Sequence, residues 1–168
     1  MTKPFIRPRP CTDPDCRGPH SPPERIALAE AICEGRGVQM TELRRRVLEL
    51  LWASRGPTSA YQLMEAIKLS DSRPVGPPTV YRALDFLMAQ GLVAKIESLN
   101  AYVPCVHPER EHDCLFFICS GCRTSVELED SRIGGLLAEA AAILGFVTTR
   151  RTVEVAGMCA QCTEAGAA

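Results

Sequence analysis

The stretch PPTVYRALDFLMAQGLV, residues 77–93, is the most strongly patterned part of this 168-residue chain. Its apolar residues recur at helical spacing, and they are Val80, Ala83, Leu84, Leu87 and Met88. The two prolines suit the start of a helix, and Gly91 suits its end. The spacing therefore predicts a helix over residues 79–90, with Arg82 on the face opposite the apolar residues.

The sequence on either side extends this helix into a larger unit. Shorter helical patterns precede it, at residues 24–35, at roughly 42–54, and after Ser59. Two short apolar runs follow it, at residues 92–97 and 101–105, and predict a hairpin of two strands. Helices followed by a hairpin are typical of a winged helix-turn-helix.

The rest of the chain has a different pattern. It predicts two strands, a helix and a further strand, at residues 114–119, 124–129, 132–144 and 146–155. A unit this small usually needs a staple or an oligomeric partner to be stable. We therefore predict an α+β protein with a proline-rich tail, a winged-helix domain and a small α/β domain, at residues 1–23, 24–104 and 105–168.

Composition limits the classes of protein. The chain has no run of 18 apolar residues, and its first residues, MTKPFIRPRP, lack the apolar segment of a secretory signal. We therefore expect a cytoplasmic protein without a membrane span. Nine cysteines in such a protein do not indicate a disulfide framework, and their odd number excludes complete internal pairing. Metal binding is the leading explanation of the cysteines.

Two CxxC pairs in the second half predict a metal site. They are Cys119-Ser120-Gly121-Cys122 and Cys159-Ala160-Gln161-Cys162. Four thiolates satisfy tetrahedral zinc and leave no open position, so such a site is structural rather than catalytic. A redox CxxC is the alternative, but it would open a helix after a strand, whereas the first pair lies between two predicted strands.

A second group of possible ligands lies between the two halves and consists of Cys105, His107, His112, Cys114 and Glu127. A mixed sulfur, nitrogen and oxygen set is typical of exchangeable zinc. The alternative is a polar loop with solvated histidines. The tail adds a third group, Cys11, Cys16 and His20, for which incidental metal binding is the simpler interpretation.

Candidate DNA contacts follow from the winged helix. Arg82 and Tyr81 would reach base edges in the major groove. Contacts to phosphates are expected from Thr79, Ser59 and Tyr61 near helix starts, and from the basic run that begins at Arg44. A single exposed arginine is ordinarily just solvated, so these assignments depend on the winged-helix context.

These motifs together resemble the ferric uptake regulator family, and most clearly its zinc uptake regulators. The resemblance rests on PPTVYRALDFLMAQGLV, ESLNAYVPC, HDCLFFICSGC and the final CAQC, and it covers roughly residues 24–162. It implies a homodimer in which residues 105–168 form the dimerisation domain. It also implies two zinc ions per protomer, one structural on the two CxxC pairs and one regulatory.

The resemblance assigns ligands to the regulatory zinc. Cys105, His112 and Glu127 match three family ligands, but Ala94 stands where relatives carry a fourth, a histidine. His107 is the first substitute, followed by Cys114 or a tail cysteine.

The sequence thus predicts a zinc-dependent repressor of zinc-uptake genes that binds palindromic operator DNA as a dimer. The alternatives are a family member that senses iron, manganese or peroxide, and a zinc buffer. We expect neither enzymatic activity nor a small-molecule substrate, because no nucleophile is paired with a base.

Overall fold

A computed structural model describes residues 21–54, 56–70, 75–109, 114–128, 130–148 and 151–166 of the chain. They belong to two compact units, one within Arg17–Arg110 and one that contains Glu111–Ala168. Helices and short sheets occur in both units, which confirms the predicted α+β fold. Among the residues described, no helix is both long and apolar enough to cross a membrane.

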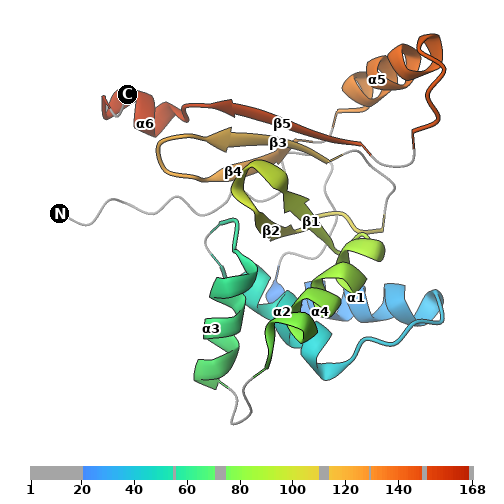
Figure 1. The fold of residues 1–168 in the computed structure, drawn as a ribbon, viewed down its shortest axis with the longest axis vertical. Coiled ribbons are helices and arrows are strands. Elements are labelled where there is room, and N and C mark those ends of the chain that lie inside the picture. The colour runs from blue at the N-terminus through green and yellow to red at the C-terminus, as the bar shows by residue number, and fades with distance from the viewer. Residues whose placement is uncertain are drawn as a thin grey trace. The chain divides into compact units, whose positions relative to one another are not determined.

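In its described part, the first unit consists of four α-helices followed by a hairpin (Figure 1). The helices are α1 (Pro22–Gly35), α2 (Glu42–Ala53), α3 (Ala60–Ser70) and α4 (Pro77–Ala89). The hairpin pairs β1 (Val93–Ile96) antiparallel with β2 (Ala101–Pro104), and the 3-10 turn η1 (Glu97–Leu99) connects them. This order confirms the predicted winged helix-turn-helix, with the hairpin as its wing.

An apolar core holds the helices of the first unit together. Its central side chains from α2, α3 and α4 are each at most 2% exposed, and they are Val47, Leu48, Leu51, Leu63, Ile67, Val80, Leu84 and Leu87. Each fully buried aliphatic side chain contributes about 1.5–3 kcal/mol to folding. Because the buried residues of α4 lie at positions three or four apart, the opposite face of this helix is left toward solvent.

Local polar residues start the helices. The hydroxyl of Ser21 accepts from the backbone N–H of Glu24, whose carboxylate accepts from the N–H of Ser21, a capping box at α1. The side chain of Thr41 caps α2. Ser59 and Gln62 exchange equivalent bonds at the start of α3, at 3.2 and 2.8 Å. These contacts fix where each helix begins.

The wing is tied to the start of α3 by a β-bridge. The backbone N–H of Thr58 donates to the carbonyl of Tyr102, and the N–H of Tyr102 donates to the carbonyl of Thr58, both at 2.9 Å. Thr58 directly precedes Ser59, the cap of α3. The bridge therefore joins the wing to the segment that leads into α3.

In its described part, the second unit is a three-stranded sheet with two helices (Figure 1). The central strand β3 (Cys114–Cys119) pairs antiparallel with β4 (Ser125–Leu128) and parallel with β5 (Thr152–Gly157). The helix α5 (Ser131–Ile143) connects β4 to β5, and the short helix α6 (Ala160–Glu164) follows β5.

The strand predicted at residues 146–155 is wrong in its first part, since β5 begins at Thr152. The chain instead closes α5 with a turn, in which Gly145 has a φ of 72° and the N–H of Phe146 donates to the carbonyl of Ala141 at 2.8 Å. In this turn a carbonyl at the end of the helix accepts a hydrogen bond that it would lack if the chain continued as an extended strand. The sequence also did not predict α6.

Candidate metal centre and nucleic-acid interface

Two turns of the second unit bring four cysteines together. Cys119 ends β3, Cys122 follows in the next turn, Cys159 caps α6 and Cys162 lies within α6. Their Sγ atoms all lie within 4.8 Å of one another. Cys119 and Cys162 are buried, whereas Cys122 is exposed. The structure thus joins the two CxxC motifs into one cluster of thiols.

Backbone hydrogen bonds shape this cluster. The N–H of Arg123 donates to the carbonyl of Cys119, which closes the turn at 2.9 Å. The N–H of Ser120 donates to the carbonyl of Gly157 at 2.8 Å, which holds the turn against the end of β5. The N–H of Cys159 donates to the Cys119 sulfur at 3.3 Å. The two motifs are therefore positioned by main-chain contacts and not by the thiols alone.

The thiols of the cluster differ in acidity. Hydrogen bonds from the backbone N–H groups of Cys122 and Cys159 lower the pKa of the Cys119 thiol to about 6. The Thr124 hydroxyl, 3.3 Å from the Cys122 sulfur, lowers the pKa of Cys122. The neighbouring sulfur of Cys159 raises the pKa of Cys162 to about 12. Sulfurs packed this closely ionise together only when a cation offsets their charge.

The spacing of one pair of sulfurs matches tetrahedral zinc. Zinc binds thiolate sulfur at about 2.3 Å, so two ligands of a regular tetrahedron lie about 3.8 Å apart. The Sγ atoms of Cys122 and Cys159 are 3.8 Å apart. Four soft thiolates are the donor set that structural zinc sites commonly use.

The second predicted ligand set is divided between the units. Cys105 and His107 belong to the first unit and Glu127, on β4, to the second, while His112 lies outside the described residues. Cys105 is 4% exposed and His107 is 1% exposed. The Nδ1 atom of His107 lies 3.1 Å from a carboxylate oxygen of Glu109. A carboxylate in this position orients a histidine that binds metal.

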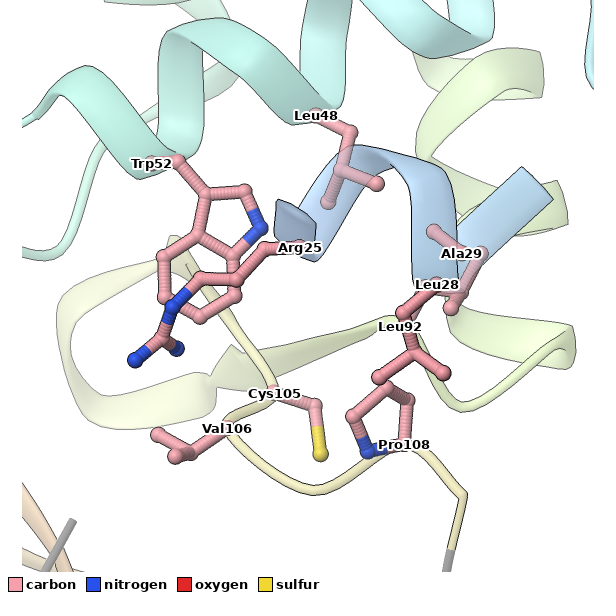
Figure 2. Close-up of a pocket in the computed structure, with 9 residues that line it drawn as sticks. All are labelled: Arg25, Leu28, Ala29, Leu48, Trp52, Leu92, Cys105, Val106 and Pro108. Carbon is pink, nitrogen blue, oxygen red and sulfur yellow. The ribbon is translucent and has the colours of Figure 1, made fainter. Parts of the chain in front are cut away.

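A small pocket adjoins Cys105 within the first unit. Its lining residues are Arg25, Leu28, Ala29, Leu48, Trp52, Leu92, Cys105, Val106 and Pro108. Figure 2 shows the Arg25 side chain alongside the Trp52 ring, and the guanidinium carbon lies 4.1 Å from the ring centroid. The segment with Cys105 therefore packs against α1 and α2 of its own unit.

The predicted DNA-contacting residues of α4 form an exposed face. Thr79, Tyr81 and Arg82 are all exposed, and Tyr81 has 44% of its surface accessible. Tyr61, at the start of α3, is 68% exposed. Ser59 is half-buried, and its hydroxyl accepts from the N–H of Gln62. A convex helix with tyrosine, threonine and arginine facing outward has the shape and chemistry for a DNA groove.

The basic run of α2 is placed differently. The guanidinium of Arg44 lies over the Phe86 ring, with its carbon 3.5 Å from the ring centroid. It also donates to the carbonyl of Gln39 at 2.5 Å. The next two arginines, Arg45 and Arg46, form ion pairs with glutamates of α1 and α2. The structure therefore does not group Arg44 with the exposed residues of α4.

Sequence reasoning missed two residues beside the proposed ligands. Thr124 contacts the Cys122 sulfur, and Glu109 contacts His107. In both pairs the two residues are separated by a single position. A hydroxyl or carboxylate two residues beyond a predicted ligand was the signal that could have found them.

Comparisons with known proteins agree with this architecture. The model of the ferric uptake regulator family matches residues 35–156. The zinc uptake regulation protein of Escherichia coli (strain K12) is 39% identical over 142 residues, which are 84% of this chain and 82% of that protein. That of Mycobacterium tuberculosis (strain H37Rv) is 28% identical over 129 residues, 75% of this chain and 95% of that protein.

Solved structures are also similar. A zinc uptake regulator complexed with zinc and DNA has a TM-score of 0.83 and 37% identity, over 89% of this chain and all of that chain. The structure of holo XcZur has a TM-score of 0.75 and 43% identity, over 83% of this chain and 96% of that one. With its winged helix, its four-thiol cluster and these relatives, this chain belongs to the ferric uptake regulator family.

Proposed function

We propose that this protein is a zinc-dependent transcriptional repressor of zinc-uptake genes. The observation that carries this proposal is its similarity, with a TM-score of 0.83, to a zinc uptake regulator complexed with zinc and DNA. The winged-helix unit binds operator DNA through α4, with base contacts from Arg82 and Tyr81. Thr79, Ser59 and Tyr61 add phosphate contacts. Residues 24–104 are then the DNA-binding domain.

A structural zinc is held by Cys119, Cys122, Cys159 and Cys162. The sulfur spacing of 3.8 Å between Cys122 and Cys159 supports this assignment. Because one CxxC follows β3 and the other follows β5, and these strands are parallel neighbours, the bound ion joins the C-terminal ends of two adjacent strands. The binding of zinc by these cysteines contributes free energy to the folding of a unit that has little apolar core of its own.

A second, regulatory zinc is bound by Cys105, His112 and Glu127, with His107 as the fourth ligand. Thiolate and imidazole together favour zinc over magnesium or calcium, which prefer oxygen ligands. Ala94, which offers no donor atom, supports a fourth ligand from elsewhere in the chain. The 3.1 Å contact between Glu109 and His107 supports the choice of His107.

Ligands from both units explain how zinc controls DNA binding. Cys105 belongs to the winged-helix unit and Glu127 to the other unit, so one ion that binds both restricts their relative motion. The recognition helices of a dimer must lie about 34–36 Å apart to enter successive major grooves. Zinc raises DNA affinity if only the restricted arrangement has this spacing. By linkage, DNA must raise the affinity for zinc by the same factor.

Residues 105–168 form the dimerisation domain, with a second copy of this chain as partner. Phe117 of β3 lies opposite Val126 of β4 and Val155 of β5 in the sheet register. The three side chains are 47%, 36% and 38% exposed, so they form an apolar row on one face of the sheet. An apolar row of this kind is expected at an interface between protomers.

A DNA-binding titration against buffered free zinc tests the function. The probe is the duplex that the zinc-loaded protein selects from a random-sequence pool, and the titration is repeated with iron and manganese. Affinity that rises only with zinc supports the proposal. A selective response to iron or manganese would contradict it, and so would metal binding without any effect on DNA affinity, which a zinc buffer would give.

Two serine variants separate the two zinc ions. Cys105→Ser is expected to keep one zinc per protomer and to lose zinc-stimulated DNA binding, because only the regulatory site has lost its thiolate. Cys119→Ser is expected to lose the structural zinc and to weaken the dimer. Mass spectrometry measures the zinc content per protomer, and sedimentation measures whether the protein is a dimer. A normal zinc response in Cys105→Ser would overturn the regulatory assignment.

A further inference from the structure

Two arginines from different helices reach the C-terminal half of α4. Arg36, the C-cap of α1, donates from one guanidinium nitrogen to the carbonyl of Gln90 at 2.7 Å and to its side-chain oxygen at 3.3 Å. Gln90 is the C-cap of α4. A guanidinium at the last carbonyl of a helix satisfies an open acceptor and offsets the negative end of the helix dipole.

The second arginine, Arg44, contacts α4 one turn earlier. Its guanidinium carbon lies 3.5 Å from the centroid of the Phe86 ring, a cation–π contact between α2 and α4. Its hydrogen bond to the carbonyl of Gln39 holds the planar group in place. A lysine cannot reproduce the flat contact and that bond together, because its ammonium is a compact charge.

These contacts are concentrated at one end of α4. The N-cap of α4 is Gly76, which makes no side-chain cap, and Pro77 and Pro78 have no N–H to bind. The exposed residues Tyr81 and Arg82 follow within the next turn. The apolar core buries one face of the helix, and the two arginines add contacts at its C-terminal half.

We propose that Arg44, assisted by Arg36, is a positioning residue that sets the orientation of the recognition helix. The inference rests on the proposed DNA-binding function. Arg44 acts through Phe86 and does not touch DNA. The alternative is the ordinary role of a basic run in a DNA-binding domain, contact with backbone phosphates.

The distinction is measurable because phosphate and base contacts differ in salt dependence and selectivity. A lost phosphate contact reduces the slope of log affinity against log salt by about 0.9 and weakens binding to every sequence. A tilted recognition helix loses contacts to base edges, but the number of phosphates that the protein neutralises, and therefore the salt slope, stays the same. The ratio of operator affinity to random-duplex affinity therefore reports positioning.

The experiment compares Arg44→Lys and Arg44→Gln with the wild type and with Arg45→Gln, a neighbouring control of the same basic run whose guanidinium pairs with Glu30 of α1 and Glu49 of α2. Duplexes are the selected operator and a random sequence of equal length, at several salt concentrations. For both Arg44 variants we expect operator affinity to fall about three- to tenfold, random-duplex affinity to stay within about twofold, and the salt slope to stay constant. Arg45→Gln is expected to keep the wild-type selectivity.

Three results would overturn the proposal. The first is a wild-type ratio of operator to random-duplex affinity in Arg44→Lys. The second is an equal loss of affinity for both duplexes. The third is a smaller slope of log affinity against log salt in Arg44→Gln. Amide hydrogen exchange provides a readout that needs no DNA, because a loosened α4 should exchange faster from Leu87 to Gln90 in Arg44→Gln and in Arg36→Gln than in Arg45→Gln. If the wild-type protein selects no duplex, the proposed function fails. The positioning role is rejected separately if amide exchange from Leu87 to Gln90 is the same in the Arg44 and Arg36 variants as in Arg45→Gln.

Discussion

Gly121 approaches Cys162 so closely that a Cβ atom on Gly121 would lie 3.1 Å from the Cys162 sulfur and 3.3 Å from its Cβ. The same atom would lie 3.2 Å from the Cε of Met158. The end of Met158 can move freely, whereas Cys162 can move only by shifting its sulfur away from the position in which it would bind a metal. The turn between Cys119 and Cys122 therefore requires glycine for space.

Gly121→Ala is expected to weaken zinc binding at the four-thiol cluster. The added methyl displaces Cys162 by a few tenths of an ångström, and overpacking of this kind costs about 1–3 kcal/mol. Competition with a chelator of known affinity measures the change in zinc binding. The matched control is Gly135→Ala on α5, where an added Cβ meets nothing within 4 Å. Equal zinc affinity in both variants would contradict the argument.

Arg123→Gly is expected to stabilise the same turn. Arg123 has a φ of 59°, in the left-handed region, which costs a residue with a Cβ about 1–2 kcal/mol and costs glycine almost nothing. Chemical denaturation of the zinc-loaded protein should therefore show a higher free energy of unfolding. A loss of more than about 1 kcal/mol would mean that the Arg123 side chain makes a stabilising contact.

The sequence was sufficient for those parts of the fold that local patterns determine. The periodicity of α4 and the two short apolar runs of the wing predicted the winged helix, because a helix face and a hairpin are encoded within a few residues. The turn at Gly145 was missed because Val147 and Val153 share the parity of a strand, although Val147 is 92% exposed. Parity alone does not distinguish a strand from a turn that precedes one.

The roles of charged side chains were less predictable. Arg44 was expected at DNA because basic runs in such domains often contact phosphates, and no pattern in the sequence indicated that its guanidinium stacks on Phe86, which is distant in the sequence. Only the packing of α2 against α4 determines that contact, and packing is not encoded in the local sequence. The contact of Thr124 with Cys122 is different, because it is local, and a hydroxyl two residues beyond a predicted ligand was its signal in the sequence.

The N-cap of α5 is expected to give the protein a pH-dependent stability. The side chain of Asp130 accepts from the N–H of Arg132 at 2.9 Å, and hydrogen bonds from the Arg132 side chain hold the pKa of Asp130 at about 2. The unfolded value is about 3.9, so the carboxylate stabilises the folded state above about pH 4. That contribution is lost as the pH falls from about 4 to about 2.

The measurement compares the free energy of unfolding of the wild type and Asp130→Ala from pH 7 to pH 2. We expect the wild type to be more stable at pH 7 and the difference to shrink between about pH 4 and pH 2. Zinc loss in acid affects both proteins and cancels in the comparison. A difference that is constant down to pH 2 would mean that Asp130 stabilises the helix by packing and not by its charge.

Phe117→Glu is expected to convert the proposed dimer to a monomer. In the register of the sheet, Phe117 lies between Val126 and Val155, so a carboxylate there enters the centre of the apolar row. In a symmetric dimer the substitution occurs twice, and each buried charge lacks a partner. We expect the dimer dissociation constant to rise at least tenfold, or about 1.4 kcal/mol. Sedimentation across a range of protein concentrations measures it.

Tyr61→Glu is the control for that experiment, because it places the same charge at an exposed aromatic residue of the other unit. It is expected to leave the dimer intact and to weaken DNA binding. Phe117→Glu should keep its structural zinc, since Cys119 and its three partner thiols are unchanged. A dimer of wild-type affinity in Phe117→Glu would place the protomer interface elsewhere, and the exposed apolar side chains at the end of α5, Ile143, Leu144 and Phe146, would be tested next.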